Sequence, residues 1–138
     1  WDILDKNLTN KYATHPVHSL EELTLLHSRF PNSIRLFMAY NDKEIAIGGT
    51  IIYDMPQVVH TQYISASPEG KRLGAIDLLF DYILNDVYAN RKGFFDFGKS
   101  TEEEGKILNT TLIFQKEGFG GRGVCYDCYT WETRSAVE

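Results

Sequence analysis

The stretch QVVHTQYISASPEGKRLGA, residues 57–75, joins a β-rich run to the start of a helix and decides how the chain folds. Residues 57–66 are rich in Val, Ile, Thr and Tyr, which is the composition of a strand. Ser67 and Pro68 then supply a helix N-cap and a first-turn proline, and two glycines and two cations follow within residues 70–74. We therefore expect a strand, a tight connection and a helix in direct succession.

Two more β-rich runs precede this stretch. IRLFMAY (34–40) and EIAIGGTIIYD (44–54) are separated by the turn residues 41–43, and a second turn leads into residues 57–66. Short β-rich runs joined by such turns predict an antiparallel meander. The pair Gly48-Gly49 inside the second run indicates a bulge or a close approach of another backbone.

Helical patterns lie on both sides of these runs. Residues 1–12 already read as a helix, and Ser19 and Glu22 form a capping box that opens an amphipathic helix ending before Pro31. After residue 75, apolar side chains recur at helical spacing, at Ile76, Leu79, Phe80, Ile83, Leu84, Val87 and Tyr88. Farther on we expect a short strand at 94–97, a helix at 105–117 and a final strand at 124–132.

Composition limits the function classes. With 138 residues, 43% hydrophobic and 24% charged, the chain reads as one soluble globular domain, 1–138, with a helical preface at 1–33 and a sheet core at 34–132. No apolar run reaches the roughly 20 residues of a membrane span and no signal peptide is recognisable, so a cytoplasmic location is expected. Because helix-like sequence starts at Trp1, we expect a fragment of a longer chain with a further N-terminal domain.

The segment GFFDFGKS, residues 93–100, matches the phosphate-binding pattern G-x-x-x-x-G-K-[ST]. A P-loop needs a strand before its first glycine and a helix at its Lys-Ser. Here Gly93 ends a helix, bulky rings follow it, and the acidic residues 102–104 come next. The order is reversed, and we reject a nucleotide-binding loop.

Other short matches have similar shortcomings. Asp96-Phe97-Gly98 lacks every other kinase element, and the glycines of 118–123 precede a predicted strand instead of opening a βαβ unit. Cys125 and Cys128 have no second pair for a structural zinc, so we interpret them as reduced thiols. His15 and His18 are interpreted as surface histidines, and no metal site is predicted.

The order of elements, the connection 67–75 and above all NTTLIFQKEGF (109–119) resemble the GNAT acetyltransferase superfamily, over about residues 34–131. The resemblance implies an α/β (α+β) fold with a mixed, mainly antiparallel central sheet flanked by helices. It also implies acetyl-CoA or another acyl-CoA as cofactor. The segment FFDFGKS followed by QKEGFGG is further similar to the Fem-like branch, whose members carry two such halves, and this chain would be the C-terminal one.

The resemblance implies cofactor-binding roles for the end of one strand, the connection after it and the late helix. The strand residues are Ile64, Ser65 and Ala66, those of the connection are Gly70, Lys71, Arg72, Leu73, Gly74 and Ala75, and the helix supplies Asn109. On physical grounds alone, the connection is either an anion site at a helix N-terminus or a simple Ser-capped helix start. Two positions depart from the family: Ile76 replaces a small residue, and Phe114 replaces a tyrosine that protonates the leaving thiolate.

Attack of an amine on a thioester requires a base near the acceptor. His60 and Gln62 are predicted to share one strand face, and Asp96 projects from the next strand, so His60 and Asp96 are candidates for base and orienting carboxylate. His60 also fits a packed, hydrogen-bonded histidine. Lys99 and Ser100 either line the acceptor mouth with Gln62 or form a solvated strand end.

Two functions are consistent with the sequence. One is an acyl-CoA-dependent N-acyltransferase acting on a primary amine, small or sugar-linked, for example of a cell-wall or polysaccharide precursor. The alternative is a non-catalytic GNAT-like module that binds a ligand or partner. The net charge of −5 disfavours nucleic acid, although an aminoacyl-tRNA donor stays open because a short basic groove would not alter the net count.

Overall fold

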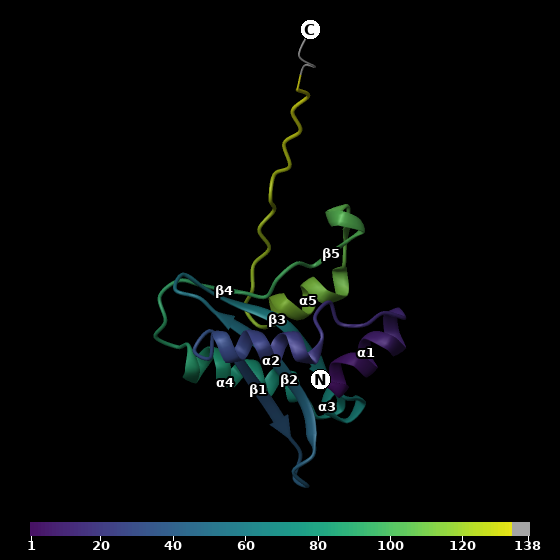
Figure 1. Cartoon of the computed structure of the whole chain (residues 1–138), viewed down its shortest axis with the longest axis vertical. Coiled ribbons are helices and arrows are strands. Elements are labelled where there is room, and N and C mark those ends of the chain that lie inside the picture. Colours follow the sequence, from purple (N-terminus) through teal and green to yellow (C-terminus); the bar gives the residue numbers. More distant parts are fainter. Residues whose placement is uncertain (134–138) are drawn as a thin grey trace.

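The computed structural model describes residues 1–133 and contains a mixed, mainly antiparallel sheet flanked by helices (Figure 1). Its strands are β1 (Ile34–Tyr40), β2 (Ala46–Asp54), β3 (Val58–Ala66) and β4 (Phe94–Asp96), in that order across the sheet. The first two pairings are antiparallel and β3 pairs with β4 in parallel. The predicted meander and fold class are confirmed.

Helices cover both faces of this sheet. In order they are α1 (Asp2–Tyr12), α2 (Leu20–Arg29), α3 (Pro68–Leu73), α4 (Ala75–Tyr82) and α5 (Thr110–Gly118), with a π-helical turn (Ile83–Val87) extending α4. Figure 1 shows α2 across one face and α4 behind the opposite one. No helix within residues 1–133 is long and apolar enough to span a membrane.

The core lies between the sheet and α4. Phe80 of α4 is fully buried and packs against Ile52 of β2 and Val59 of β3 in one cluster. The rings of Phe95, Phe97 and Phe119 surround Phe80 at centroid distances of 6.1, 5.3 and 4.9 Å. These aromatic contacts fix β4 and the end of α5 to the central helix.

The sequence signal for α2 is confirmed, and the bulge that Gly48-Gly49 indicated lies at the neighbouring Ile47, because Ala39 pairs with Gly48 and Tyr40 with Ala46. The Ser19 hydroxyl accepts the Glu22 N–H at 3.1 Å, and the Glu22 carboxylate accepts the Ser19 N–H at 2.7 Å, which completes the capping box. A Cβ at Gly48 would lie 3.1 Å from the Ala75 Cβ, so the absence of a side chain at Gly48 lets the start of α4 pack closely against β2.

Two predictions near the C-terminus are wrong. The predicted helix does not start at residue 105, because β5 (Thr101–Glu102), a 3-10 turn (Glu103–Gly105) and β6 (Ile107–Leu108) form a hairpin there and α5 starts at Thr110. Residues 124–132 form no strand; they extend away from the body, and no described strand lies alongside to pair with them (Figure 1). Their large side chains stay exposed, at Val124, Tyr126, Tyr129 and Trp131.

Candidate active site

The sheet opens where β3 and β4 diverge. The two strands pair only at Val58–Phe94, Val59–Phe95 and His60–Asp96, and β3 then continues to Ala66. Within the described residues, no strand lies on the outer edge of β3 beyond this point. The divergence leaves main-chain groups of β3 available beside a pair of ionisable side chains.

His60 and Asp96 meet at this opening, as the sequence predicted. His60 Nδ1 lies 2.7 Å from Asp96 Oδ2, and both side chains keep contact with solvent, with exposed fractions of 32% and 47%. Asp96 faces away from the core because its neighbours Phe95 and Phe97 pack against Phe80 on the other side of the sheet. The arrangement leaves the second imidazole nitrogen of His60 able to take a proton.

The environment keeps Asp96 ionised. Burial by itself raises the pKa of Asp96, but the hydrogen bond from the Gly98 N–H at 2.7 Å and the hydrogen bond and charge of His60 act in the opposite direction. The charge of Lys116 adds to them, and the net result is a pKa of Asp96 below its ordinary value. A charged carboxylate can orient the imidazole and stabilise its protonated form.

A bulge in β3 changes the predicted face of this strand. Tyr63 pairs with Ile51 and Thr61 with Ile52, so Gln62 is the extra residue without a partner across β2. Because His60 pairs with Tyr53, and Tyr53 and Ile51 share a face of β2, Tyr63 lies on the same face as His60. Tyr63 thus takes the place that regular alternation gave to Gln62.

Sequence reasoning missed the polar side chains beside His60. The Tyr63 hydroxyl lies 2.8 Å from His18 Nδ1, and the rings of Tyr63 and Trp1 meet edge to face at 6.2 Å. The Tyr53 hydroxyl is buried without a partner among the described residues, and burial first, then the charge of Tyr63, raises the pKa of Tyr53. The position of Tyr63 on this face follows from the bulge, which the sequence pattern does not reveal.

The predicted cofactor edge of β3 is partly occupied by α1. The Ser67 N–H donates to the Ile47 carbonyl of β2. Because successive residues of a strand direct their main-chain groups to opposite edges, those of Ile64 and Ala66 face the outer edge of β3. Asn7 of α1 donates its side-chain amide to the Ala66 carbonyl at 2.7 Å and to the Ser65 hydroxyl at 2.6 Å. Ile64 therefore presents the main-chain groups that this contact leaves untouched.

The connection after β3 is the helix α3, not an open loop. The Ser67 hydroxyl accepts the Gly70 N–H at 3.0 Å and the Ser67 carbonyl accepts the Lys71 N–H at 2.9 Å, which is the Ser-capped helix start. Gly74, with φ of 70°, then ends α3 and precedes α4 without a side-chain cap. Uncapped amides therefore belong to the first turn of α4, beginning at Ala75, beside the exposed Lys71, Arg72 and Leu73.

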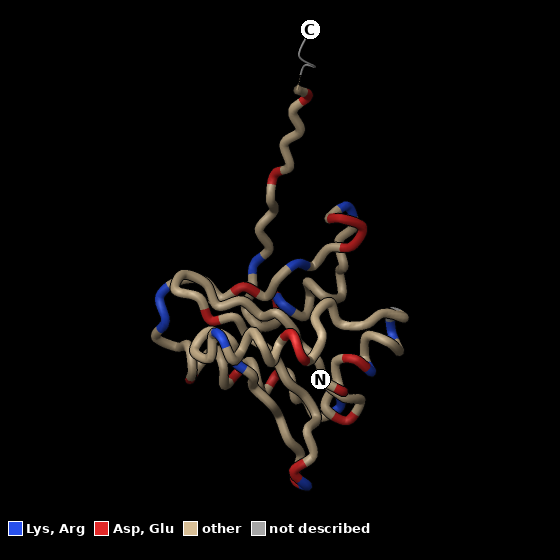
Figure 2. The backbone as a smooth tube through the Cα atoms, in the orientation of Figure 1, with Lys and Arg blue, Asp and Glu red and all other residues tan. Residues whose placement is uncertain are grey.

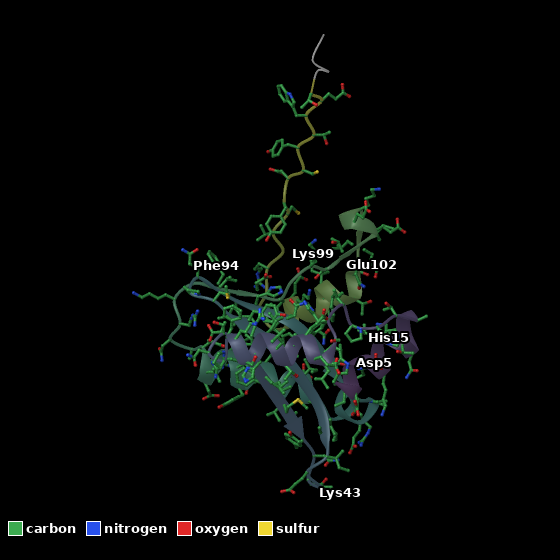
Figure 3. The ribbon with its side chains drawn as sticks, in the orientation of Figure 1. Asp5, His15, Lys43, Phe94, Lys99 and Glu102 are labelled. Carbon is green, nitrogen blue, oxygen red and sulfur yellow. The ribbon has the colours of Figure 1, made fainter. Side chains whose placement is uncertain are left out.

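The remaining predicted residues lie around α5. The Asn109 side chain caps α5 by accepting the Leu112 N–H at 2.9 Å and donates to Glu102 at 2.6 Å, so both ends of its amide are used. Lys99 is exposed and follows β4 toward the hairpin (Figure 3), and the Ser100 carbonyl accepts the Asn109 N–H. Phe114 is 78% exposed and lines a cavity of about 650 Å³ between α4 and α5.

The histidines and cysteines set aside from the sequence have no metal-like arrangement. His15 pairs with Asp5 at 2.7 Å (Figure 3), and Cys125 and Cys128 are free and exposed. Among residues 1–133, no three His, Cys, Asp or Glu side chains gather closely enough to hold a metal ion. Positive and negative residues are interspersed over the body (Figure 2), without a continuous basic stripe in the described part.

Comparison with known proteins agrees with this architecture. Residues 6–104 match the family described as the acetyltransferase (GNAT) domain, while curated protein sequences give no significant match. Among solved structures, a possible acetyltransferase from Clostridium difficile 630 is 14% identical, with a TM-score of 0.66 over 97% of this chain and 89% of its own.

Two further solved structures have similar folds. The structure of AAC(6')-Iy in complex with the bisubstrate analogue CoA-S-monomethyl-acetylneamine is 15% identical, with a TM-score of 0.62 over 91% of this chain and 86% of that one. The aminoglycoside antibiotic 6'-N-acetyltransferase AAC(6')-Ih from Acinetobacter baumannii is also 15% identical, with a TM-score of 0.58 over 97% and 94%. At these identities the likeness concerns the fold alone.

Proposed function

The chain belongs to the GNAT acetyltransferase family, and from that premise we propose that it transfers an acyl group from acyl-CoA to a primary amine. The observation that carries the proposal is the 2.7 Å contact between His60 and Asp96 at the point where β3 and β4 separate. Such a reaction requires a base near the acceptor amine, and His60, oriented by Asp96 at an opening of the sheet, can supply it.

In this proposal His60 is the base. Asp96 accepts the N–H of His60 Nδ1, which leaves Nε2 to take the proton that an ammonium must lose before it attacks a carbonyl. Acyl-CoA, when bound, supplies the activated acyl group. Main-chain N–H groups on the outer edge of β3 would stabilise negative charge on the carbonyl oxygen.

The cofactor would lie along the outer edge of β3 and the start of α4. Ile64 has outward main-chain groups that can pair with an amide-containing arm, and the first turn of α4 has uncapped amides that suit a pyrophosphate. Lys71 and Arg72 add positive charge nearby. Because Asn7 already uses the Ala66 carbonyl, Ile64 carries more of this role than Ser65 or Ala66.

We propose a small or sugar-linked amine as acceptor, the class to which aminoglycosides belong. The Fem-like resemblance of residues 94–100 and 115–121 extends this to amines of cell-wall or polysaccharide precursors. Lys99 and Ser100, which follow Asp96, would then border the acceptor.

The alternative, a non-catalytic binding module, is favoured by two positions. Phe114 cannot donate a proton, and the Asn109 side chain is engaged in capping α5 and in bonding Glu102. Under this alternative, the domain binds a ligand or partner and releases no thiol.

Isothermal calorimetry with acetyl-CoA and free CoA tests the proposal. Gly74→Asn and Gly74→Asp are a matched pair, since Asn and Asp adopt the positive φ of 70° more readily than most side chains, both place a Cβ 3.3 Å from the Asp77 carboxylate, and the two differ in charge. We expect binding by the wild type and Gly74→Asn and weaker binding by Gly74→Asp. Absence of wild-type binding, or equal affinity of the two variants, contradicts the cofactor site; binding without thiol release on any amine supports the module.

A further inference from the structure

Lys116 of α5 is a buried ammonium that the proposed reaction does not use. Its exposed fraction is 8%, and no other charged side chain within residues 1–133 is buried to this extent. Burial lowers the pKa of Lys116, and the charge of Asp96 offsets part of that effect. A buried cation is tolerated in a fold only where hydrogen bonds and opposite charge replace its hydration.

The partners of Lys116 are main-chain carbonyls of the segment that leaves β4. Lys116 Nζ donates to the Gly98 carbonyl at 3.0 Å and to the Lys99 carbonyl at 2.6 Å. Two bonds from one ammonium fix the direction of both peptide groups. Through them α5 holds the residues that directly follow Asp96.

The same segment determines the position of Asp96. The Gly98 N–H donates to Asp96 Oδ1 at 2.7 Å, while Asp96 Oδ2 contacts His60 Nδ1 at 2.7 Å. Thr61 of β3 donates its hydroxyl to the Asp96 carbonyl at 2.9 Å and anchors the backbone from the other side. Gly98 therefore links the two sets of contacts: its carbonyl accepts from Lys116, and its N–H, on the other side of its Cα, donates to the carboxylate that contacts the imidazole.

We propose that Lys116 is a positioning residue, which holds the Gly98–Lys99 backbone so that Asp96 stays aligned with His60. This role rests on the proposed acyl transfer. It differs from a plain packing role because it links α5 to the geometry and charge of the site. The charged groups facing Asp96 are His60 from β3 and Lys116 from α5.

The decisive variant is Lys116→Met, which keeps the length of the side chain and removes the ammonium. Lys106→Met is its control, because it makes the same charge change on an exposed residue of the hairpin. Carbon-13 NMR follows the signal of the Asp96 carboxyl carbon from pH 2 to 7, and this signal is assigned by its absence from the spectrum of Asp96→Asn. We expect the titration midpoint of Asp96 to lie at higher pH in Lys116→Met than in the wild type and in Lys106→Met.

The companion readout is the imidazole N–H proton of His60. In the wild type we expect slow exchange with water, and in Lys116→Met exchange faster by about tenfold, because a misaligned carboxylate no longer holds the proton. Both readouts need no substrate, so they test Lys116 even if no acyl transfer is found. Unchanged Asp96 titration and unchanged exchange in a folded Lys116→Met protein would overturn the proposal.

If the proposed acyl transfer is detected, its steady-state kinetics give the third readout. We expect kcat of Lys116→Met to fall by about tenfold or more while KM for acyl-CoA stays the same, with the acid limb of the kcat profile moved to lower pH, because a misaligned Asp96 stabilises the protonated imidazole less. A fall in kcat without movement of that limb would assign Lys116 to packing. Should Lys116→Met not fold, the wild-type titration still decides, because an Asp96 midpoint at or above the ordinary value contradicts the proposal.

Discussion

His60 and Asp96 are joined twice, since they are partners in the parallel β3–β4 ladder and their side chains meet at 2.7 Å. The ladder fixes their backbones opposite each other at the last paired position, just before the strands diverge. Their contact therefore depends on the sheet itself and not on a mobile loop.

Asp96→Asn should lower kcat by about a hundredfold with little change in KM for acyl-CoA. The amide is nearly the same size, but it carries no charge to stabilise a protonated His60 and can present its NH₂ group to Nδ1. Steady-state kinetics measure the effect. Asp42→Asn, in an exposed turn, is the control and should behave like the wild type. Equal turnover of the two variants would remove Asp96 from the reaction.

The pH dependence of stability should also report Asp96. Because the folded-state pKa of Asp96 is lower than its unfolded value of about 4, its ionised form stabilises the fold above that value, and this contribution is lost as pH falls through the folded pKa. The Tm difference between wild type and Asp96→Asn should be largest near neutral pH and shrink below about pH 4. A Tm difference that is constant from pH 3 to 7 would contradict the lowered pKa.

Local patterns predicted most of the fold. β-rich runs bounded by turn residues located β1 to β3, helical spacing located α4, and the Ser19–Glu22 capping box located the start of α2. These signals are local, because each depends on residues a few positions apart. The segment 124–132 has the composition of a strand but forms none, since a strand needs a partner that composition cannot supply.

The candidate site was only partly predictable for the same reason. The meeting of His60 and Asp96 followed from strand order, whereas the place of Tyr63 depends on a bulge at Gln62 that no turn residue marks. Likewise the two carbonyls that hold Lys116 are 17 and 18 positions away along the chain. Contacts between distant segments of this kind appear only in the folded structure.

Asp54 should matter for stability and not for chemistry. Its side chain is 13% exposed, accepts the Tyr88 hydroxyl at 2.9 Å and pairs with Arg91 at 2.6 Å, which ties the end of the α4 region to β2. Asp54→Ala should lower the free energy of unfolding by about 2 kcal/mol, because the two donors lose a partly buried charged acceptor. Urea unfolding measures this. Asp86→Ala, at an exposed position, is the control, and equal stability of the two variants would show that the network contributes nothing.

Phe114→Tyr should increase kcat by severalfold. The ring is 78% exposed at the cavity between α4 and α5, so an added hydroxyl meets no steric barrier and leaves Tm unchanged. The phenol restores a proton donor at the position where the resemblance to the family implies one for the departing thiolate. Thiol release in the presence of an acceptor amine measures the gain, and Phe114→Leu separates the hydroxyl from the ring. If Phe114→Tyr leaves kcat at the wild-type value while the calorimetric affinity for acetyl-CoA is retained, the thiolate is protonated elsewhere, and Phe114 belongs to the surface of the cavity alone.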